Sequence, residues 1–302
     1  MALNKEQEEW LEKIDEDLSE LENVPKALVT EEFCLEAVKN NGNALKYVPD
    51  EHKTAELCLI AVKNNGIPLE FVPAKHKTAE LCLDAVKRAY TALPFVPAEH
   101  KTAELYLEAV KKAGFALKYV PAEHKTAELC LEAVKDSGEA LQFVPDEHRT
   151  AELCLIAVKS FGPSLEYVPD KHKTAELCLE AVKAYDGDDN ITVALQFVPA
   201  KHKTAELCLT AVKKNGYTLA YVPAKHKTAE LCLEAVVNHG LALEYVPAKH
   251  KTEELCLEAV KEDDEAIEFV PKKLQSKVTA GWRAAKAALR KDDDDEDDFV
   301  FL

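Results

Sequence analysis

The chain has 302 residues, with 55 acidic against 38 basic side chains and a formal net charge of −17. It contains no apolar run of the roughly 20 residues that a membrane-spanning helix needs and no apolar N-terminal signal region, so we expect no membrane partner. Residues 1–23 and 292–298 each carry a net charge of −7, so the acidity lies at the two ends and the array between them is nearly neutral.

One sequence repeats ten times. A representative repeat, Thr54 to Pro73, reads TAELCLIAVKNNGIPLEFVP and follows residues 50–53, DEHK. The step is 24 residues except between Thr174 and Thr204, where it is 30 because six residues are inserted near 184–193. A fixed period of this length is typical of a solenoid. The repeats, numbered 1–10 in chain order, open at Thr30, Thr54, Thr78, Thr102, Thr126, Thr150, Thr174, Thr204, Thr228 and Thr252.

The first half of each repeat predicts an α-helix of about three turns. In repeat 2, Thr54 is a good N-cap and Glu56 places a carboxylate at the positive end of the helix dipole. Gly66 stands where helices often end in a left-handed residue. The apolar face of this helix is made by Leu57, Cys58, Leu59, Ala61 and Val62.

The second half predicts one or two further helical turns, either α or 3₁₀, which Pro73 ends in repeat 2. One position in this half is aromatic in every repeat, and Val-Pro always follows it. The ten aromatic residues are Tyr47, Phe71, Phe95, Tyr119, Phe143, Tyr167, Phe197, Tyr221, Tyr245 and Phe269.

A single repeat buries too little apolar surface to offset its backbone entropy, so it must stack on its neighbours. We therefore predict an all-α fold, an elongated α-solenoid of ten helix–short-helix repeats with helical caps at both ends. Residues 1–23 are expected to form an N-terminal acidic capping helix, begun by Asn4 and running to about Asn23, and residues 24–275 the ten-repeat solenoid. A C-terminal capping helix is expected in 276–291, with Ser276 in place of the threonine. Residues 292–302 are expected to be a disordered acidic tail.

The nine cysteines occupy one position of the repeat. Packed helices lie about 8–10 Å apart, which exceeds the reach of a disulfide, so we expect buried thiols in a reducing compartment and a cytoplasmic protein. Histidine precedes eight of the nine cysteines by six residues, as His52 precedes Cys58. Leucine takes the histidine position at the two ends, as Leu28 and Leu274, which favours packing over metal binding.

We expect no metal and no other cofactor, and a metal-binding Cys/His repeat protein stays an alternative. Zinc needs four ligands, and each His–Cys pair supplies two. In the insertion, Asp186, Asp188 and Asn190 have the first spacings of a calcium loop, but Ile191 and Phe197 replace its glycine and closing glutamate. A solvated loop is the favoured interpretation.

A basic residue precedes the opening threonine of repeats 2–10. Such a row can track phosphates, but glutamates such as Glu51 and Glu99 lie two residues away and leave no net basic field. We therefore predict a salt-bridged solvent edge and no binding to nucleic acid. The row consists of Lys53, Lys77, Lys101, Lys125, Arg149, Lys173, Lys203, Lys227 and Lys251.

No phosphate loop, nucleotide fingerprint, zinc-protease helix or nucleophile elbow occurs, so we expect no enzyme and nominate no catalytic residue. Large apolar side chains do replace the usual residue at variable positions, and such side chains serve protein partners. Some of them are equally explained as filling gaps between repeats. The candidates for binding a protein or peptide are Ile60, Tyr90, Tyr106, Phe115, Ile156, Phe161, Tyr217, Phe299 and Phe301.

The favoured function is thus a non-enzymatic interaction scaffold, monomeric, that binds along one face of the solenoid. An acidic inhibitor or immunity-type protein that acts through its charged ends is the main alternative. The repeat phrase ELCLEAVKxxGxALxYVPxxHKT resembles the tandem two-helix repeats of a family catalogued as a domain of unknown function, over residues 24–275. It is similar, more loosely, to leucine-rich-repeat-variant solenoids. The family has no established activity, so the resemblance implies the helical repeat fold and no functional residue.

Overall fold

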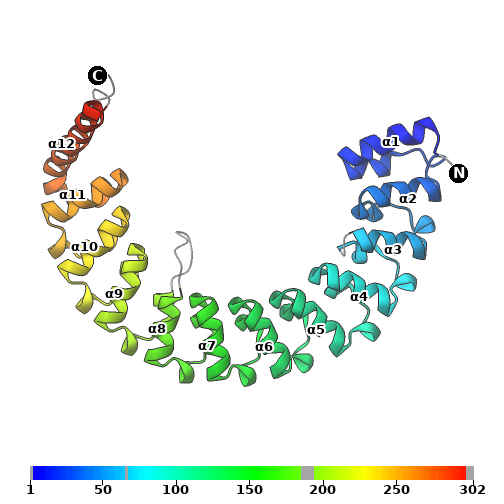
Figure 1. Cartoon of the computed structure of the whole chain (residues 1–302), viewed down its shortest axis with the longest axis horizontal. Coiled ribbons are helices and arrows are strands. Elements are labelled where there is room, and N and C mark those ends of the chain that lie inside the picture. The colour runs from blue at the N-terminus through cyan, green and yellow to red at the C-terminus, as the bar shows by residue number, and fades with distance from the viewer. Residues whose placement is uncertain (1–2, 65–66, 185–193, 297–302) are drawn as a thin grey trace. The chain divides into compact units, whose positions relative to one another are not determined.

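The computed structural model describes residues 3–64, 67–184 and 194–296. These residues form α-helices and short 3₁₀-helices (η), and no strand occurs among them. The chain divides into two compact units, Met1–Arg149 with repeats 1–5 and Thr150–Leu302 with repeats 6–10. Within each unit, each α-helix packs on the next and each longer 3₁₀-helix lies beside the 3₁₀-helices of the neighbouring repeats (Figure 1). The predicted all-α repeat fold is confirmed.

The first unit contains six α-helices and the 3₁₀-helices that follow them. The α-helices are α1 (Lys5–Glu16), α2 (Glu31–Asn40), α3 (Ala55–Asn64), α4 (Ala79–Arg88), α5 (Ala103–Lys112) and α6 (Ala127–Asp136). The longer 3₁₀-helices are η1 (Leu18–Asn23), η2 (Gly42–Lys46), η4 (Ile67–Phe71), η6 (Tyr90–Phe95), η8 (Gly114–Tyr119) and η10 (Gly138–Phe143). Single 3₁₀ turns lead into the next repeat: η3 (Asp50–His52), η5 (Ala74–His76), η7 (Ala98–His100), η9 (Ala122–His124) and η11 (Asp146–His148).

The second unit repeats this order. Its α-helices are α7 (Ala151–Ser160), α8 (Ala175–Lys183), α9 (Ala205–Lys214), α10 (Ala229–Asn238), α11 (Glu253–Glu262) and α12 (Lys272–Glu296). Its longer 3₁₀-helices are η12 (Gly162–Tyr167), η14 (Ala194–Phe197), η16 (Gly216–Tyr221), η18 (Gly240–Tyr245) and η20 (Asp264–Phe269). Its single turns are η13 (Asp170–His172), η15 (Ala200–His202), η17 (Ala224–His226) and η19 (Ala248–His250). The second element of the repeat, left open by the sequence, is therefore 3₁₀.

The opening threonine starts the α-helix of every repeat. In repeat 2, the Thr54 hydroxyl accepts a hydrogen bond from the Leu57 amide at 3.2 Å. The equivalent bond is present in the other nine repeats. An N-cap of this kind stabilises a helix by about 1 kcal/mol, so each repeat fixes the start of its own helix locally.

The core lies between the α-helices and the 3₁₀-helices of neighbouring repeats. In repeat 5, Cys130 and Val134 from α6 and Leu141 from η10 are all 0% exposed. The equivalent cysteine, valine and leucine are buried in repeat after repeat, and Tyr106 replaces the cysteine in repeat 4. Because these side chains come from short elements that bury one face each, stability depends on contacts between neighbours.

The glycine that follows the α-helix in most repeats has a different role from the predicted one. Asn41, which ends α2, is extended (φ −146°, ψ 113°), and Gly42 begins η2 without a left-handed backbone. A Cβ on Gly42 would lie 2.5 Å from the carbonyl oxygen of Ala61 in the next repeat. Glycine is therefore needed here for close approach between repeats, and the predicted left-handed helix end is wrong at Gly42. Gly66 lies outside the described residues.

The N-terminal cap is a helix pair, where the sequence predicted one helix to about Asn23. Asn4 and Gln7 form the expected capping box, with bonds of 2.9 and 3.0 Å between each amide and the other side chain. The helix ends at Glu16 because Asp17 turns extended and its side chain caps η1 through the Ser19 amide at 2.8 Å. The cap thus copies the α–3₁₀ order of the repeats.

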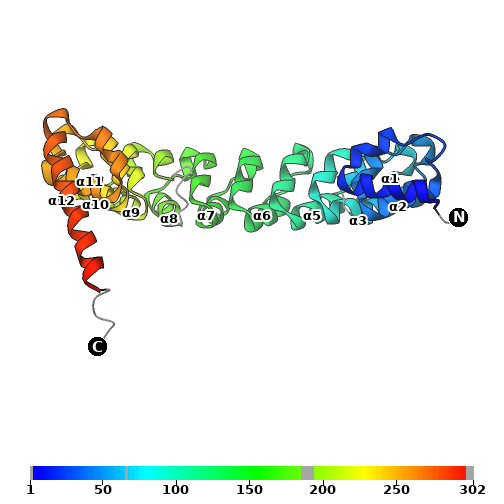
Figure 2. The same cartoon turned by 90° about the horizontal axis from the view of Figure 1, so that it is seen from above.

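The C-terminal helix begins and ends at other residues than predicted. Leu274, Gln275 and Ser276 replace the His-Lys-Thr of the repeats, and α12 begins at Lys272 and continues past Ser276 without a new cap. It also runs through residues 292–296, where the sequence predicted disorder, because extending a formed helix costs little. Figure 2 shows the end of α12 extending beyond α11. The rest of the predicted tail, with Phe299 and Phe301, lies outside the described residues, as do Asp186, Asp188 and Asn190.

Candidate functional site

Two of the predicted partner residues lie beside repeat aromatics on the 3₁₀-helices of the first unit. The rings of Tyr90 and Tyr119 are 6.5 Å apart, and Phe115 meets Phe143 edge-on at 6.1 Å. All four side chains are half-buried. We call Tyr90, Phe115, Tyr119 and Phe143 the aromatic surface. Lys118 places its ammonium 4.5 Å above the Tyr119 ring, so this surface is apolar with a cation at its edge.

The second unit presents a related but smaller set. Tyr217 lies on η16, with its ring 4.7 Å from the His239 ring. A hydrogen bond to Glu244, with smaller contributions from burial and from the phenols of Tyr221 and Tyr217, raises the pKa of Tyr245. Phe161 ends α7 and is half-buried. The structure therefore places Tyr217 beside His239.

Tyr106 is not a surface residue. It takes the cysteine position of α5 and is 1% exposed, with its ring 5.1 Å from the His124 ring of the next repeat. Burial raises the pKa of its phenol. Tyr106 fills space between repeats 4 and 5, as the gap-filling interpretation proposed, and is unavailable to a partner.

Ile60 and Ile156 are half-buried on α3 and α7, in different units. Their position usually holds an acid that pairs with the lysine three residues on, as Glu132 does with Lys135 at 3.3 Å. Each isoleucine removes one such pair and leaves an apolar side chain in its place.

Sequence reasoning missed the most exposed large apolar side chains of the described residues. These are Leu209 (39%), Tyr221 (41%), Leu233 (43%) and Val237 (56%), all in repeats 8 and 9. The leucines gave no signal, because leucine fills their position in every repeat. Val237 did give one, because the other nine repeats have lysine there.

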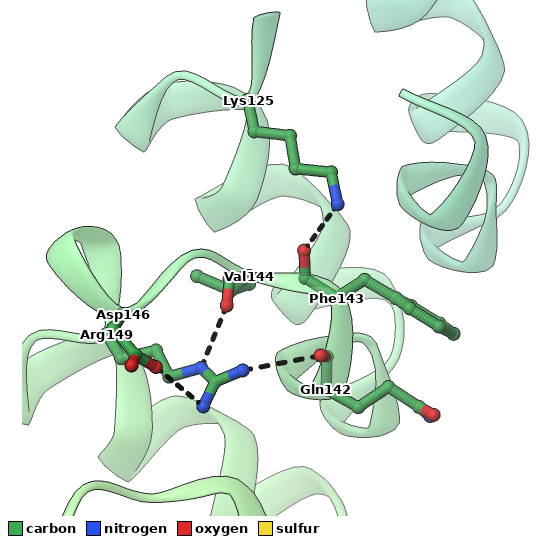
Figure 3. Close-up of polar contacts among 6 residues, drawn as sticks. All are labelled: Lys125, Gln142, Phe143, Val144, Asp146 and Arg149. Atoms are coloured by element: carbon green, nitrogen blue, oxygen red, sulfur yellow. Dashed lines mark hydrogen bonds and ion pairs between the residues drawn. The ribbon is translucent and has the colours of Figure 1, made fainter. Parts of the chain in front are cut away.

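The basic row is a set of internal hydrogen bonds rather than the predicted solvent edge. Lys125, just before repeat 5, donates to the carbonyl oxygen of Phe143 in that repeat, 18 residues on, at 2.8 Å (Figure 3). Lysines 77, 203, 227 and 251 make the equivalent bond at 2.9–3.1 Å. Burial lowers the pKa of the lysines at 125, 203, 227 and 251.

In three repeats the basic residue pairs with an aspartate three residues earlier rather than with the expected glutamates. Lys53 meets Asp50 at 2.9 Å, Arg149 meets Asp146 at 3.0 Å and Lys173 meets Asp170 at 3.5 Å. Arg149 also donates to the carbonyls of Val144 at 2.8 Å and Gln142 at 3.3 Å (Figure 3). The three basic side chains are only 10–18% exposed, so they too are largely covered by the protein.

The Lys125 bond predicts a measurable loss of stability in the Lys125→Met variant. Methionine keeps the apolar stem but leaves the Phe143 carbonyl without its donor, and we expect a loss of about 1.5 kcal/mol. The measurement is urea unfolding of the full chain, with hydrogen exchange of the repeat 5 amides. Lys159→Met is the control, because that side chain is 56% exposed and its pair with Glu180 spans 3.7 Å, and it should cost under about 0.5 kcal/mol. Equal losses in the two variants would contradict the prediction.

The cysteines are buried and protonated. Burial raises the pKa of the Cys58, Cys82, Cys130 and Cys178 thiols to about 11 and that of Cys34 to about 12. Thiolate is the form that binds metal and attacks substrates. Among the described residues, no three His, Cys, Asp or Glu side chains lie close enough together to hold a metal ion.

A pocket of about 240 Å³ lies where α12 packs against α11 and η20. Its lining is mostly apolar, and Asp264 is its one acidic residue. The lining residues are Val260, Asp264, Ile267, Thr279 and Trp282. This set contains no nucleophile paired with a base, so the pocket offers apolar contact rather than a recognisable reaction centre.

Within the part of the chain that the structure describes, no helix is both long and apolar enough to cross a membrane.

The repeated α–3₁₀ units define an all-α tandem-repeat solenoid. A family model described as a domain of unknown function, DUF4116, matches residues 30–77, 102–149, 126–173 and 229–275. These matches cover more than half of the chain, which therefore belongs to that family. The comparison with curated proteins found no match.

Proposed function

We propose that the chain is a non-enzymatic scaffold that binds a protein or peptide partner. The observation that carries this proposal is the aromatic surface, where large side chains vary from repeat to repeat over a constant core. Tyr90 takes a position that holds glycine in seven other repeats, and Phe115 takes one that holds Asn43 or Glu139 elsewhere. Neither ring is needed to complete the repeat, so their presence on a half-exposed face is explained by contact with a partner.

Half-exposed aromatic side chains suit this use, because they contribute large apolar contact area at low cost in side-chain entropy. Lys118, above the Tyr119 ring, adds a charge that can fix the orientation of an acidic or polar group. The partner expected here is a peptide segment or a protein surface with exposed apolar side chains.

The double variant Tyr90→Gly, Phe115→Glu tests the proposal with residues that other repeats already accept. We expect this variant to fold normally. Its affinity for a partner that the unchanged chain binds should be at least about tenfold lower. The partner is first identified by crosslinking and affinity purification from the native cell, and its affinity is then measured with purified components.

The matched control is Ile60→Glu with Ile156→Glu, which restores the usual acid at another position of the repeat. It should leave the affinity within about twofold of the unchanged chain, since the added charges lie outside the aromatic surface. Equal affinity of the double aromatic variant and the unchanged chain for every retained partner would overturn the proposed role of this surface.

A further inference from the structure

The second unit exposes three apolar side chains on one face of two adjoining α-helices. Leu209 on α9 and Leu233 on α10 occupy the same position of successive repeats, and they are 39% and 43% exposed. Val237 lies one turn after Leu233 on the same helix face and is 56% exposed. We call Leu209, Leu233 and Val237 the α9–α10 patch.

The corresponding leucine is better covered elsewhere. In repeats 1–7 and 10 this leucine is half-buried. At the end of the array α12 packs over it: a Cβ on Gly281 would lie 3.2 Å from the Leu257 side chain. A helix therefore already covers this position once within the chain. On α9 and α10 the position is left open.

Val237 also changes the charge of this face. Lysine stands at its position in the other nine repeats, and in repeats 1, 4, 5, 7 and 10 it pairs with the acid three residues before it, as in Glu36–Lys39 at 2.7 Å and Glu258–Lys261 at 2.8 Å. In repeat 9, valine takes the place of the lysine that would face Glu234. The substitution thus enlarges the apolar patch and removes the neighbouring positive charge at once.

Acidic residues dominate the helices on this side of the patch. Helix α10 contains Glu230 and Glu234 and no lysine or arginine, and both glutamates are exposed. Helix α11 contains four glutamates against Lys261. Glu258 and Glu253 of α11 pair with Lys261 and Lys277, and α9 contains Lys213 and Lys214, so the carboxylates without a basic residue on their own helix are those of α10. A partner that covers the α9–α10 patch would lie beside Glu230 and Glu234, which favours basic residues at the edge of its apolar face.

The geometry points to an amphipathic helix as the occupant. Packed helices lie about 8–10 Å apart, and seven residues of a helix rise about 10.5 Å. Apolar residues at i and i+7 of a helix laid across α9 and α10 thus match Leu209 and Leu233, and a residue at i+3 or i+4 falls between them near Val237. The spacing of the two leucines, with Val237 one helical turn after Leu233, matches the apolar stripe of an amphipathic helix.

We propose that the α9–α10 patch binds an amphipathic helix of a partner protein, with Lys or Arg flanking its apolar stripe. The inference rests on the proposed scaffold function and names one class of partner for it. The stripe packs on Leu209, Leu233 and Val237, and the basic residues face Glu230 and Glu234 of α10.

The experiment uses a labelled synthetic helical peptide with leucine at i, i+3, i+4 and i+7 and lysine on its flanks, titrated with the full chain by fluorescence anisotropy. A second peptide has glutamate in place of every lysine. We expect the leucine–lysine peptide to bind more weakly as salt rises, and the leucine–glutamate peptide to bind at least about tenfold more weakly. Val237→Lys, which restores the residue of the other repeats, should lower the affinity for the leucine–lysine peptide at least about fivefold.

Ala220→Lys is the matched control. It adds the same charge on η16, at a position where Lys46 and Lys118 stand in other repeats. The affinity of this variant for the leucine–lysine peptide should stay within about twofold of that of the unchanged chain. Circular dichroism of each variant shows that the fold is kept.

Equal binding of the two peptides, or no effect of Val237→Lys beyond that of Ala220→Lys, would overturn the inference. So would self-association of the unchanged chain that Val237→Lys abolishes, because a second copy would then cover the patch. With a native partner, loss of binding in the Tyr90→Gly, Phe115→Glu variant and not in Val237→Lys would contradict this inference alone. The reverse result would contradict the aromatic surface alone.

Discussion

Raising the pH above about 9 should destabilise the chain and unfold it cooperatively. Eight cysteines have a raised pKa because burial disfavours their thiolates, and the values reach about 11 for Cys58 and about 12 for Cys34 against a usual 9.0. Unfolded thiols therefore release protons at a pH where folded thiols keep them. The stability that this difference contributes is fully present below pH 9.0 and is lost as pH rises toward about 11–12.

The size of the effect follows from the number of thiols. One pKa unit corresponds to about 1.4 kcal/mol, so a thiol whose pKa rises from 9.0 to about 11 accounts for roughly 3 kcal/mol. The buried lysines oppose this trend, because their lowered pKa makes stability rise with pH. The thiols have the larger effect on the free energy of unfolding, because there are more of them and because they are fully buried, whereas the lysines are partly exposed.

The measurement is far-UV circular dichroism between about pH 8 and 12 in the presence of a reductant, with thiolate absorbance followed in parallel. We expect helix loss and thiolate formation to coincide. A Cys58→Ala, Cys82→Ala variant should be less stable at neutral pH but lose less stability on going to high pH. Thiolate formation at about pH 9 in a chain that keeps its helices would contradict the burial of the thiols.

Gly216→Val should strongly destabilise the second unit. A side chain at this position collides with the carbonyl oxygen of Ala235 in the next repeat, which is backbone and cannot turn aside. The Gly216 amide also donates to the Asn238 side chain at 2.9 Å, a bond that depends on the same close approach. We expect a loss of roughly 3 kcal/mol or more, since repeats 8 and 9 must separate.

Hydrogen exchange locates this damage. Protection should fall first in α9, η16 and α10, because stability in such an array is a sum over neighbouring contacts. Ala220→Val, at an exposed position of the same 3₁₀-helix, is the control and should change the unfolding midpoint little. A uniform loss of protection along the whole unit, or none at all, would contradict the local account.

Local signals gave the repeat and its helix starts, because each threonine caps the helix that it precedes. The role of Gly42 escaped prediction because the atom it must avoid, the Ala61 carbonyl oxygen, is brought there only by stacking. The lysine row failed in the same way: Lys125 reaches a carbonyl 18 residues on, which its sequence neighbours do not reveal.

Prediction of the candidate surface succeeded only in part. Tyr90 and Phe115 proved half-exposed and close to other rings, whereas Tyr106 proved buried. Tyr106 was predictable in principle, since its position holds a core cysteine in the other nine repeats. Leu209 and Leu233 were not, because identical leucines differ in exposure only through what the next helix covers.

The contact between the glycine of one repeat and the alanine carbonyl of the next recurs along the chain, and this affects how the number of repeats encoded by the gene can change. Because described contacts within each unit join a repeat to itself or to its neighbour, any two of its interfaces are nearly interchangeable. Unequal recombination that removed or duplicated a 24-residue segment would leave interfaces of the same kind on both sides of the junction. Repeat number should thus vary freely among descendants of one ancestral gene, while substitutions such as Val237 for lysine mark individual repeats as distinct.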